Sequence, residues 1–338
     1  MLLLTANEVE TLCEGLDVPS LISRVLELHA LNKTILPAEA YLGWAGRAGG
    51  RARTLNMPGY IDGNPPLVGT KIINGNADNV MKGLARASGI TILFDPQTAR
   101  PRCLMDAAFI SATRTAAITL VCARALQRSP RTTLALFGAG VLAKRHILLL
   151  SQYLDIDHIT VFDVNPDRTQ SLLGDLAHTL PNGVLRSAVS VGDALEGATL
   201  VVAATTTAHP YIFYDMLSPG CLLINVSLDD FGMDVFENAE KLYVDDIGLV
   251  QSDEHRILGK LIRAGIITMP GDQGGRNRIT GTIGDLLLGN VPGRTTEEEL
   301  ILVNPFGMAI EDIVIADAVY QGAMKVGLGV EVILDGAP

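Results

Sequence analysis

The sequence predicts an α/β protein with two domains, on two observations. The first is an apolar run at 134–137 that breaks into closely spaced glycines, followed by a helical pattern and a second apolar run that ends on Asp163. The second is the alternation of strand-like and helical patterns that continues from there to residue 244. Such alternation is typical of a doubly wound, mostly parallel sheet. We therefore predict a Rossmann-type sheet domain and a second, α+β domain.

The N-terminal part predicts the α+β domain. Thr5 and Glu8 have the spacing of a capping box for a short helix, and residues 19–32 carry apolar residues at helical spacing. Strand patterns follow, and the turn-rich segment 95–101 joins the last two. The expected strands are 53–58, 67–74, 90–94 and 102–105. Their order predicts an antiparallel sheet covered by helices.

A long helix over 107–126, rich in small residues at 111–117, is expected to lead into the sheet domain. Further elements are expected at 165–180 (helix), 200–204, 221–226 and 241–244 (strands), 309–325 (helix) and 330–334 (strand). The last two have no place in a minimal Rossmann unit, so we expect them to return to the first domain. The predicted domains are 1–118 with 309–338, and 119–308.

The glycines of the 138–143 turn predict a dinucleotide site. They let the backbone turn sharply and approach a pyrophosphate, whose charge then lies against free N–H groups at the start of the next helix. Glycines also make ordinary strand-to-helix turns, but Asp163 lies where a carboxylate binds the ribose hydroxyls and repels the extra phosphate of NADP. NAD is therefore the predicted cofactor. The expected cofactor-binding residues are Arg114, Thr115, Gly138, Ala139, Gly140, Val141, Leu142, Asp163, Thr205, Thr207, Val226 and Ser227.

Composition narrows the class of partner. The net charge is −11 without basic clusters, which argues against nucleic acid or an anionic membrane. No uninterrupted apolar run is long enough to span a bilayer, and the N-terminus turns polar after four residues, so we expect a cytoplasmic protein. The four cysteines lack the spacing of a metal site or disulfide framework. A small-molecule ligand and no metal are expected.

Three cations of the first domain are candidate substrate ligands. Lys71 lies within a strand pattern, Arg53 begins another, and Arg114 lies in the small-residue helix. Each alone is explained as a surface residue or an edge-strand lysine. Together, with small neighbours that let a ligand approach, they could bind the carboxylates of an amino-acid substrate.

Asp229 is the candidate acid or base of the sheet domain. It follows the strand pattern at 221–226, and loops after the carboxyl ends of parallel strands line the ligand crevice. The alternative is a helix N-cap, a role that Asp230 or Asp234 could also fill. His146 is expected on a helix surface.

These residues together resemble the ornithine cyclodeaminase and μ-crystallin family, over nearly the whole chain. Within it the sequence resembles most the dehydrogenases of 2,3-diaminopropionate biosynthesis. The segments that carry this similarity are 83–89, 92–98, 210–215, 244–246, 291–294 and 302–312.

The resemblance implies oxidation of N-(2-amino-2-carboxyethyl)-L-glutamate with NAD, and hydrolysis to L-2,3-diaminopropionate and 2-oxoglutarate for siderophore or peptide natural-product biosynthesis. Arg53, Lys71 and Arg114 would hold substrate carboxylates, and Lys71 or Asp229 would manage protons. It also implies a homodimer, with the N-terminal domain and the C-terminal helix at the interface.

The sequence departs from the family pattern at three positions. Met233 stands where ornithine cyclodeaminases tend to have a lysine, Leu55 replaces an expected glutamate, and Ile72 follows Lys71 where the diaminopropionate type usually has tryptophan. Two alternatives stay open at this point: an ornithine cyclodeaminase or another imine-forming or imine-reducing amino-acid dehydrogenase, and a non-catalytic, crystallin-like protein that binds the cofactor.

Overall fold

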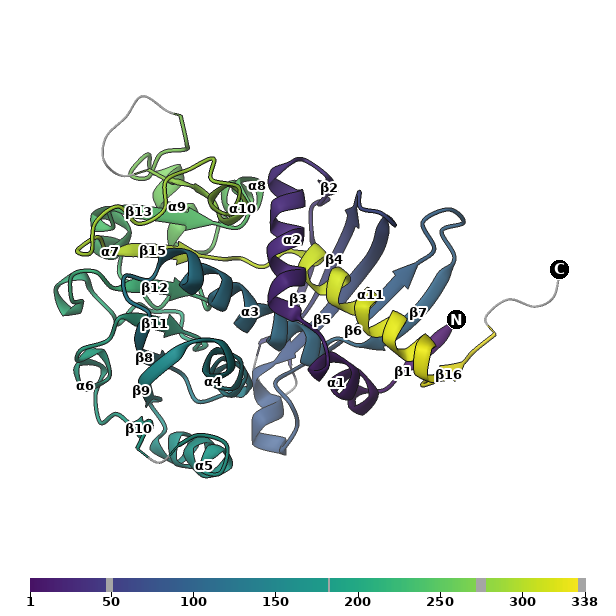
Figure 1. The fold of residues 1–338 in the computed structure, drawn as a ribbon, viewed down its shortest axis with the longest axis horizontal. Coiled ribbons are helices and arrows are strands. Elements are labelled where there is room, and N and C mark those ends of the chain that lie inside the picture. The colour runs from purple at the N-terminus through teal and green to yellow at the C-terminus, as the bar shows by residue number, and fades with distance from the viewer. Residues whose placement is uncertain (47–50, 182, 272–277, 334–338) are drawn as a thin grey trace. The chain divides into compact units, whose positions relative to one another are not determined.

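The computed structural model describes residues 1–46, 51–181, 183–271 and 278–333. The chain forms two compact units (Figure 1): unit 1 is Met1–Arg114 with Met308–Pro338, and unit 2 is Thr115–Gly307.

Unit 1 is built on a mixed sheet whose long strands are antiparallel, as predicted. Its strand order is β16 (Val330–Glu331), β1 (Leu2–Leu4), β7 (Pro101–Asp106), β6 (Ala87–Phe94), β5 (Leu67–Asn76), β4 (Arg51–Ile61), β2 (Thr34–Ile35), and β3 (Ala40–Ala45) also pairs with β4. β4 and β5 pair without a register shift from Ala52 opposite Asn76 to Ile61 opposite Leu67. Along these strands, side chains alternate between the two faces of the sheet.

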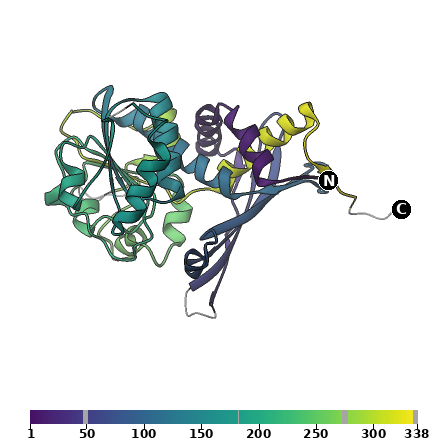
Figure 2. The ribbon, with the colours of Figure 1, turned by 90° about the horizontal axis from the view of Figure 1, so that it is seen from below.

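Helices cover one face of this sheet (Figure 2). Helix α11 (Ala309–Val326) packs on β4, β5 and β6, and α1 (Ala6–Glu14) and α2 (Val18–Ala30) pack on α11. Gly59 lets α11 approach closely, because a Cβ atom there would lie 3.1 Å from Ile313. The short helix η1 (Ala77–Lys82) joins β5 to β6. The predicted capping box is confirmed, since Glu8 accepts a hydrogen bond from the backbone N–H of Thr5 at 2.8 Å.

Unit 2 has the predicted doubly wound sheet, and all of its strands are parallel. The order is β10 (Leu185–Ser187), β9 (Asp155–Phe162), β8 (Arg131–Phe137), β11 (Leu200–Ala203), β12 (Leu222–Asn225), β15 (Ile301–Asn304), β13 (Lys241–Val244) and β14 (Gly281–Thr282). β11, β12, β13 and β15 are buried throughout, as expected for strands covered on both faces. From β8 the next strands along the chain, β9 and β10, are added on one side, and from β11 the later strands are added on the other side. Ligands of such sheets bind at this switch point, between β8 and β11.

The helices of unit 2 connect these strands. They are α4 (Val141–Tyr153), α5 (Pro166–Leu176), α6 (Val191–Leu195), η2 (Tyr214–Met216), α7 (Met233–Asn238), α8 (Ile247–Ser252), α9 (Ile257–Arg263) and α10 (Ile283–Leu287). Helix α3 (Ala108–Leu126) begins in unit 1 and ends in unit 2. Within the described ranges it is the one helix long and apolar enough to cross a bilayer, although its sequence is not an uninterrupted apolar run. Of its apolar window, 72% is buried inside the structure, as in a core helix.

The prediction for His146 is wrong. This residue of α4 is 0% exposed, so it faces the core of unit 2 and not a helix surface. The four cysteines are buried and free.

Candidate functional site

The glycine turn after β8 has a backbone that only glycine adopts without strain. Gly138 has φ +94°, and its N–H donates to the carbonyl oxygen of Phe162 at 2.8 Å. A Cβ atom there would lie 2.7 Å from the carbonyl oxygen of Ala204, the residue that follows β11. Gly138 therefore brings the ends of β8 and β11 together.

Asp163 lies directly beside this turn. One carboxylate oxygen accepts a hydrogen bond from the N–H of Ala139 at 2.9 Å, and the other accepts from the N–H of Asn165 at 2.9 Å. Each oxygen keeps a further lone pair. The half-buried carboxylate is thus fixed in place with acceptor capacity left for ribose hydroxyls.

The start of α4 fits the pyrophosphate of a dinucleotide. Its N-cap is Gly140, and no side chain caps it, so the first N–H groups, from Val141 and Leu142, are open to an anion. A Cβ atom at Gly140 would meet nothing within 4 Å, which leaves space above the turn. With Asp163, these features fit NAD as the cofactor that unit 2 holds.

Asp230 organises the loops that follow β11 and β12. Its carboxylate accepts hydrogen bonds from Thr205 Oγ1 at 2.6 Å, from the Tyr211 hydroxyl at 2.8 Å and from Ser227 Oγ. Desolvation and the neighbouring Asp230 charge raise the pKa of Tyr211, so its hydroxyl remains a donor. Thr205 Oγ1 in turn accepts from the N–H of Thr207 at 3.1 Å. The predicted cofactor residues Thr205, Thr207 and Ser227 therefore belong to one network, next to Val226 in the chain.

Asp229 makes structural contacts at the start of α9 (Ile257–Arg263), but it is not the helix N-cap that the sequence analysis gave as the alternative, because the N-cap of α9 is Arg256. Its carboxylate forms an ion pair with Arg256 and accepts a hydrogen bond at 3.3 Å from the N–H of Ile257, the first residue of α9. The preceding residue, Leu228, has φ +76°, a costly conformation for a side chain branched beyond Cβ. The turn that aims Asp229 is thus strained, and its catalytic role stays a prediction.

Unit 1 contains a buried cluster of two cations and two acids. Lys71 Nζ lies 2.6 Å from Asp312 Oδ2, and Arg114 contacts Glu311 at 3.0 Å through Nη1 and Asp312 at 3.5 Å through Nε. Lys71 is 1% exposed, and both acids are 0% exposed. Burial lowers the pKa of the Lys71 amine against the opposing attraction of Asp312. The cluster brings together two of the three predicted substrate cations.

Unsatisfied polar atoms remain in this cluster. Asp312 Oδ1 and the hydroxyl oxygen of Thr91, which pairs with Lys71 across β5 and β6, are buried without a hydrogen-bond partner among the described residues. Buried polar atoms without partners usually mark an unfilled ligand or water position. The Lys71 region of unit 1 is therefore suited to a polar ligand.

The third predicted cation, Arg53, lies apart from the cluster. It faces Gly75 across β4 and β5, four residues along β5 from Lys71. Arg114 belongs to unit 1 and Thr115 to unit 2, and their expected contacts with NAD stay predictions. Within the described ranges no group of three or more potential ligands is placed to hold a metal ion.

Sequence reasoning did not assign roles to Glu311, Asp312 or Asp230. A signal for the first two was present, since an acidic pair in the otherwise apolar stretch 308–316 requires buried cations as partners. Asp230 was considered only as a helix cap, and in the structure the N-cap of α7 is Gly232.

Buried His146 gives a testable pH dependence. Its Nδ1 lies 2.7 Å from the carbonyl oxygen of Leu142 and therefore donates, so Nε2 accepts from Thr119 Oγ1 at 3.0 Å. Burial lowers the pKa of His146 from 6.5 to about 4. As pH falls from 7 to 4, the unfolded chain takes up a proton that the folded protein does not, which lowers the free energy of unfolding by about 3 kcal/mol. This loss is expected to be absent from His146→Gln in urea unfolding at the two pH values, and equal losses in both proteins would contradict it.

Comparison with known proteins identifies the family. The model of the ornithine cyclodeaminase/mu-crystallin family matches residues 44–326. The chain belongs to this family. It is 31% identical, over 311 residues, to N-((2S)-2-amino-2-carboxyethyl)-L-glutamate dehydrogenase of Staphylococcus aureus (strain NCTC 8325 / PS 47), covering 91% of this chain and 90% of that relative.

Solved structures of the ornithine cyclodeaminase/mu-crystallin fold agree. The crystal structure of CmnK has a TM-score of 0.91 at 34% identity and covers 100% of this chain and 99% of that one. An archaeal alanine dehydrogenase dimer with bound NAD has a TM-score of 0.84 at 22% identity, with 99% of each chain covered, and shows the shared fold. The predicted family and fold class are confirmed. The chain is an enzyme of this amino-acid dehydrogenase and cyclodeaminase family, and NAD is the cofactor that its glycine turn fits.

Proposed function

We propose that the protein oxidises N-(2-amino-2-carboxyethyl)-L-glutamate with NAD and hydrolyses the product to L-2,3-diaminopropionate and 2-oxoglutarate. The observation that carries the reaction class is the buried Lys71 amine beside Arg114, a pair suited to a substrate carboxylate and a proton. The 31% identity to the Staphylococcus aureus dehydrogenase supports the substrate.

In the proposed reaction, Arg114 holds the carboxylate of the carbon that is oxidised, and the Lys71 amine donates a hydrogen bond to it. NAD, held by the Gly138 turn and Asp163, would supply the acceptor for the hydride of this carbon. The secondary amine loses a proton as the C=N bond forms, and the neutral Lys71 amine accepts it, a form that burial favours. Water then adds to the imine carbon, with Asp229 as the base that activates it. The C–N bond breaks, the nitrogen leaves as the amine of diaminopropionate, and the oxidised carbon becomes the keto group of 2-oxoglutarate.

The direct test is NADH formation at 340 nm with synthetic N-(2-amino-2-carboxyethyl)-L-glutamate, with ornithine and alanine as competing substrates. We expect turnover with the first compound, equal amounts of NADH and 2-oxoglutarate, and a decrease of about 100-fold or more in Asp229→Asn. No turnover of this compound would overturn the assignment. Proline formation from ornithine without net NADH would establish cyclodeamination instead.

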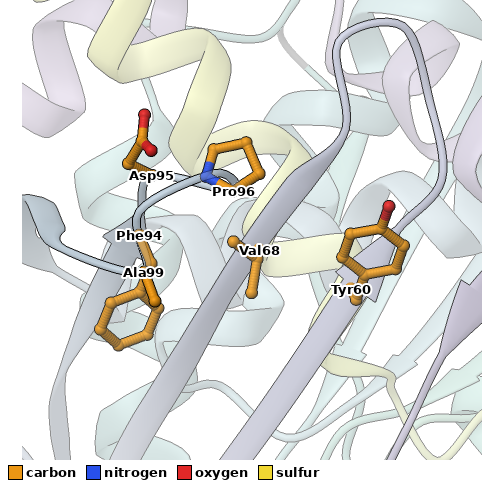
Figure 3. Close-up of a pocket in the computed structure, with 6 residues that line it drawn as sticks. All are labelled: Tyr60, Val68, Phe94, Asp95, Pro96 and Ala99. Atoms are coloured by element: carbon orange, nitrogen blue, oxygen red, sulfur yellow. The ribbon is translucent and has the colours of Figure 1, made fainter.

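We also propose that the protein is a homodimer. The face of the unit 1 sheet that α11 does not cover has a shallow apolar hollow (Figure 3) lined by Tyr60, Val68, Phe94, Asp95, Pro96 and Ala99. An apolar sheet face of this kind is suited to a second copy of the chain. The solved structure of the archaeal alanine dehydrogenase is a dimer, which supports a two-fold assembly. Light scattering is expected to give a mass of twice 35.9 kDa for the wild type and the mass of one chain, 35.9 kDa, for Val68→Asp. A monomeric wild type would contradict the proposal.

We also propose a use for the product and a location for the reaction. The proposed diaminopropionate would be a building block for a siderophore or a peptide natural product. A cytoplasmic site is proposed because the cysteines are buried thiols, as in reducing compartments.

A further inference from the structure

Two arginines of unit 1 flank the same glycine. A Cβ atom placed on Gly75 would lie 3.6 Å from Arg53 Nε and 3.9 Å from Arg86 Nη1. Arg53 comes from β4, and Arg86 immediately precedes β6. The strands on either side of β5 therefore bring two guanidinium groups over Gly75, where β5 has no side chain.

This arginine pair has no acidic partner in the part of the chain that the structure describes. Neither guanidinium forms an ion pair there, and the neighbouring residues 47–50 contain no acid in their sequence. Desolvation and the positive charge of Arg53 lower the pKa of Arg86, so the two like charges interact. Like charges held together repel each other, and a bound anion offsets that repulsion.

The pair lies on the same sheet face as Lys71. Gly75 and Lys71 are four residues apart on β5, so they face the same side of the sheet. Their partners on β4, Arg53 and Met57, are also four residues apart and face that side as well. Four residues of a strand span about 13 Å. Between Lys71 and Gly75 lie Ile73 and, on β4, Leu55, both half-buried and apolar. The face thus offers cationic side chains at both ends of a short apolar stretch: Lys71 and Arg114 with their acids at one end, and the arginine pair at the other.

We propose that Arg53 and Arg86 form a second carboxylate subsite, which binds a carboxylate of the substrate remote from the one held by Lys71 and Arg114. The inference rests on the proposed function, because it concerns the far end of the same substrate. The proposed substrate has three carboxylates, and each outer one lies roughly 5–6 Å from the carboxylate of the oxidised carbon when extended. Lys71 and Arg53 both have long side chains, so their charged groups can lie closer together than their Cα atoms.

The subsite explains selection among amino acids. A cationic side chain such as that of ornithine would be repelled by two guanidinium groups. The side chain of alanine is too short to reach the two guanidinium groups, so they would not increase the affinity for alanine. An acidic amino acid that extends from its reacting carbon is the class of substrate that uses both positive positions.

The experiment combines charge-removing variants with truncated substrates. The variants are Arg86→Gln, Arg53→Gln, and the matched control Lys82→Gln, which removes the same charge from exposed η1 nearby. The ligands are the full compound, N-(2-amino-2-carboxyethyl)-L-norvaline, which lacks the γ-carboxylate, and N-(2-aminoethyl)-L-glutamate, which lacks the carboxylate of the other arm. Binding is measured by calorimetry with NADH present, which prevents hydride transfer, and KM and kcat are measured with NAD.

Arg86→Gln is expected to raise the Kd and KM of the full compound about 10- to 100-fold with little change in kcat. The truncated ligand that lacks the bound carboxylate should bind equally to wild type and to Arg86→Gln, and Lys82→Gln should behave as wild type. Unchanged affinity of Arg86→Gln for all three ligands overturns the subsite, even if turnover confirms the proposed reaction. Carboxylate-dependent loss of binding without turnover in wild type supports the subsite and overturns the reaction. Absence of binding of all three ligands overturns both.

Discussion

Lys71→Met is expected to destabilise the protein by about 3–5 kcal/mol and to abolish most of its activity. The substitution leaves Asp312 buried, with Arg114 Nε at 3.5 Å as the closest remaining cation. An uncompensated buried charge is costly in this range. Loss of a group that accepts a proton in the reaction lowers the rate about 100-fold or more. Chemical denaturation and NADH formation measure the two effects.

A double variant separates the two effects. Lys71→Met with Asp312→Asn removes both charges, so most of the lost stability should return while activity stays low. Recovery of activity together with stability would show that Lys71 has only a structural role. A single variant as stable as wild type would contradict the buried ion pair itself.

The pH dependence of the rate tests the protonation state of Lys71. Burial lowers its pKa from 10.5, so the neutral amine becomes available at lower pH than in free lysine. For oxidation, kcat/KM should therefore rise with pH and level off below pH 10.5. A plateau that appears only above pH 10.5 would exclude the neutral amine as the proton acceptor in the reaction.

Gly138→Ala is expected to eliminate measurable NAD binding and to cost about 1–3 kcal/mol of stability. The new Cβ atom would lie 2.7 Å from the carbonyl oxygen of Ala204, and φ +94° is unfavourable for alanine. The ends of β8 and β11 must separate, which moves the turn and the open N–H groups of α4. NADH fluorescence titration and thermal unfolding measure both quantities.

Gly140→Ala is the matched control for Gly138→Ala. Gly140 has φ −95°, and its Cβ atom would meet nothing within 4 Å, so the folded protein should keep its stability. If the pyrophosphate lies over this turn, the methyl group should weaken NAD binding alone. Equal NAD affinity of Gly140→Ala and wild type would show that the pyrophosphate does not lie over Gly140.

Local patterns predicted much of the fold. The apolar run of β8, the glycines after it and Asp163, which follows β9, belong to one strand–helix–strand unit, and the hydrogen bond from Ala139 to Asp163 joins residues 24 apart. Strand β13 was predicted with its observed ends, since an apolar run between turn signals defines it. His146 was misplaced because its neighbours on α4 are mixed, and its burial depends on Thr119 of α3.

The candidate site was predictable only in part, because its pairs join distant segments. Lys71 and Asp312 are 241 residues apart in the chain, and no local pattern links them. The partner of Arg53 was equally hidden, since Arg86 reaches Gly75 only through the pairing of β5 with β6. Sequence reasoning found the charged residues, and tertiary structure determined which of them meet.

The return of α11 to unit 1 sets the order in which the protein can assemble during synthesis. Lys71 emerges from the ribosome long before Asp312, and β1 can pair with β16 only after β16 has been synthesised. Unit 2, a continuous segment from Thr115 to Gly307, can fold meanwhile. The nascent chain would then acquire its dinucleotide turn first, and Lys71 would gain its counter-charge only after the whole of unit 2 has been synthesised.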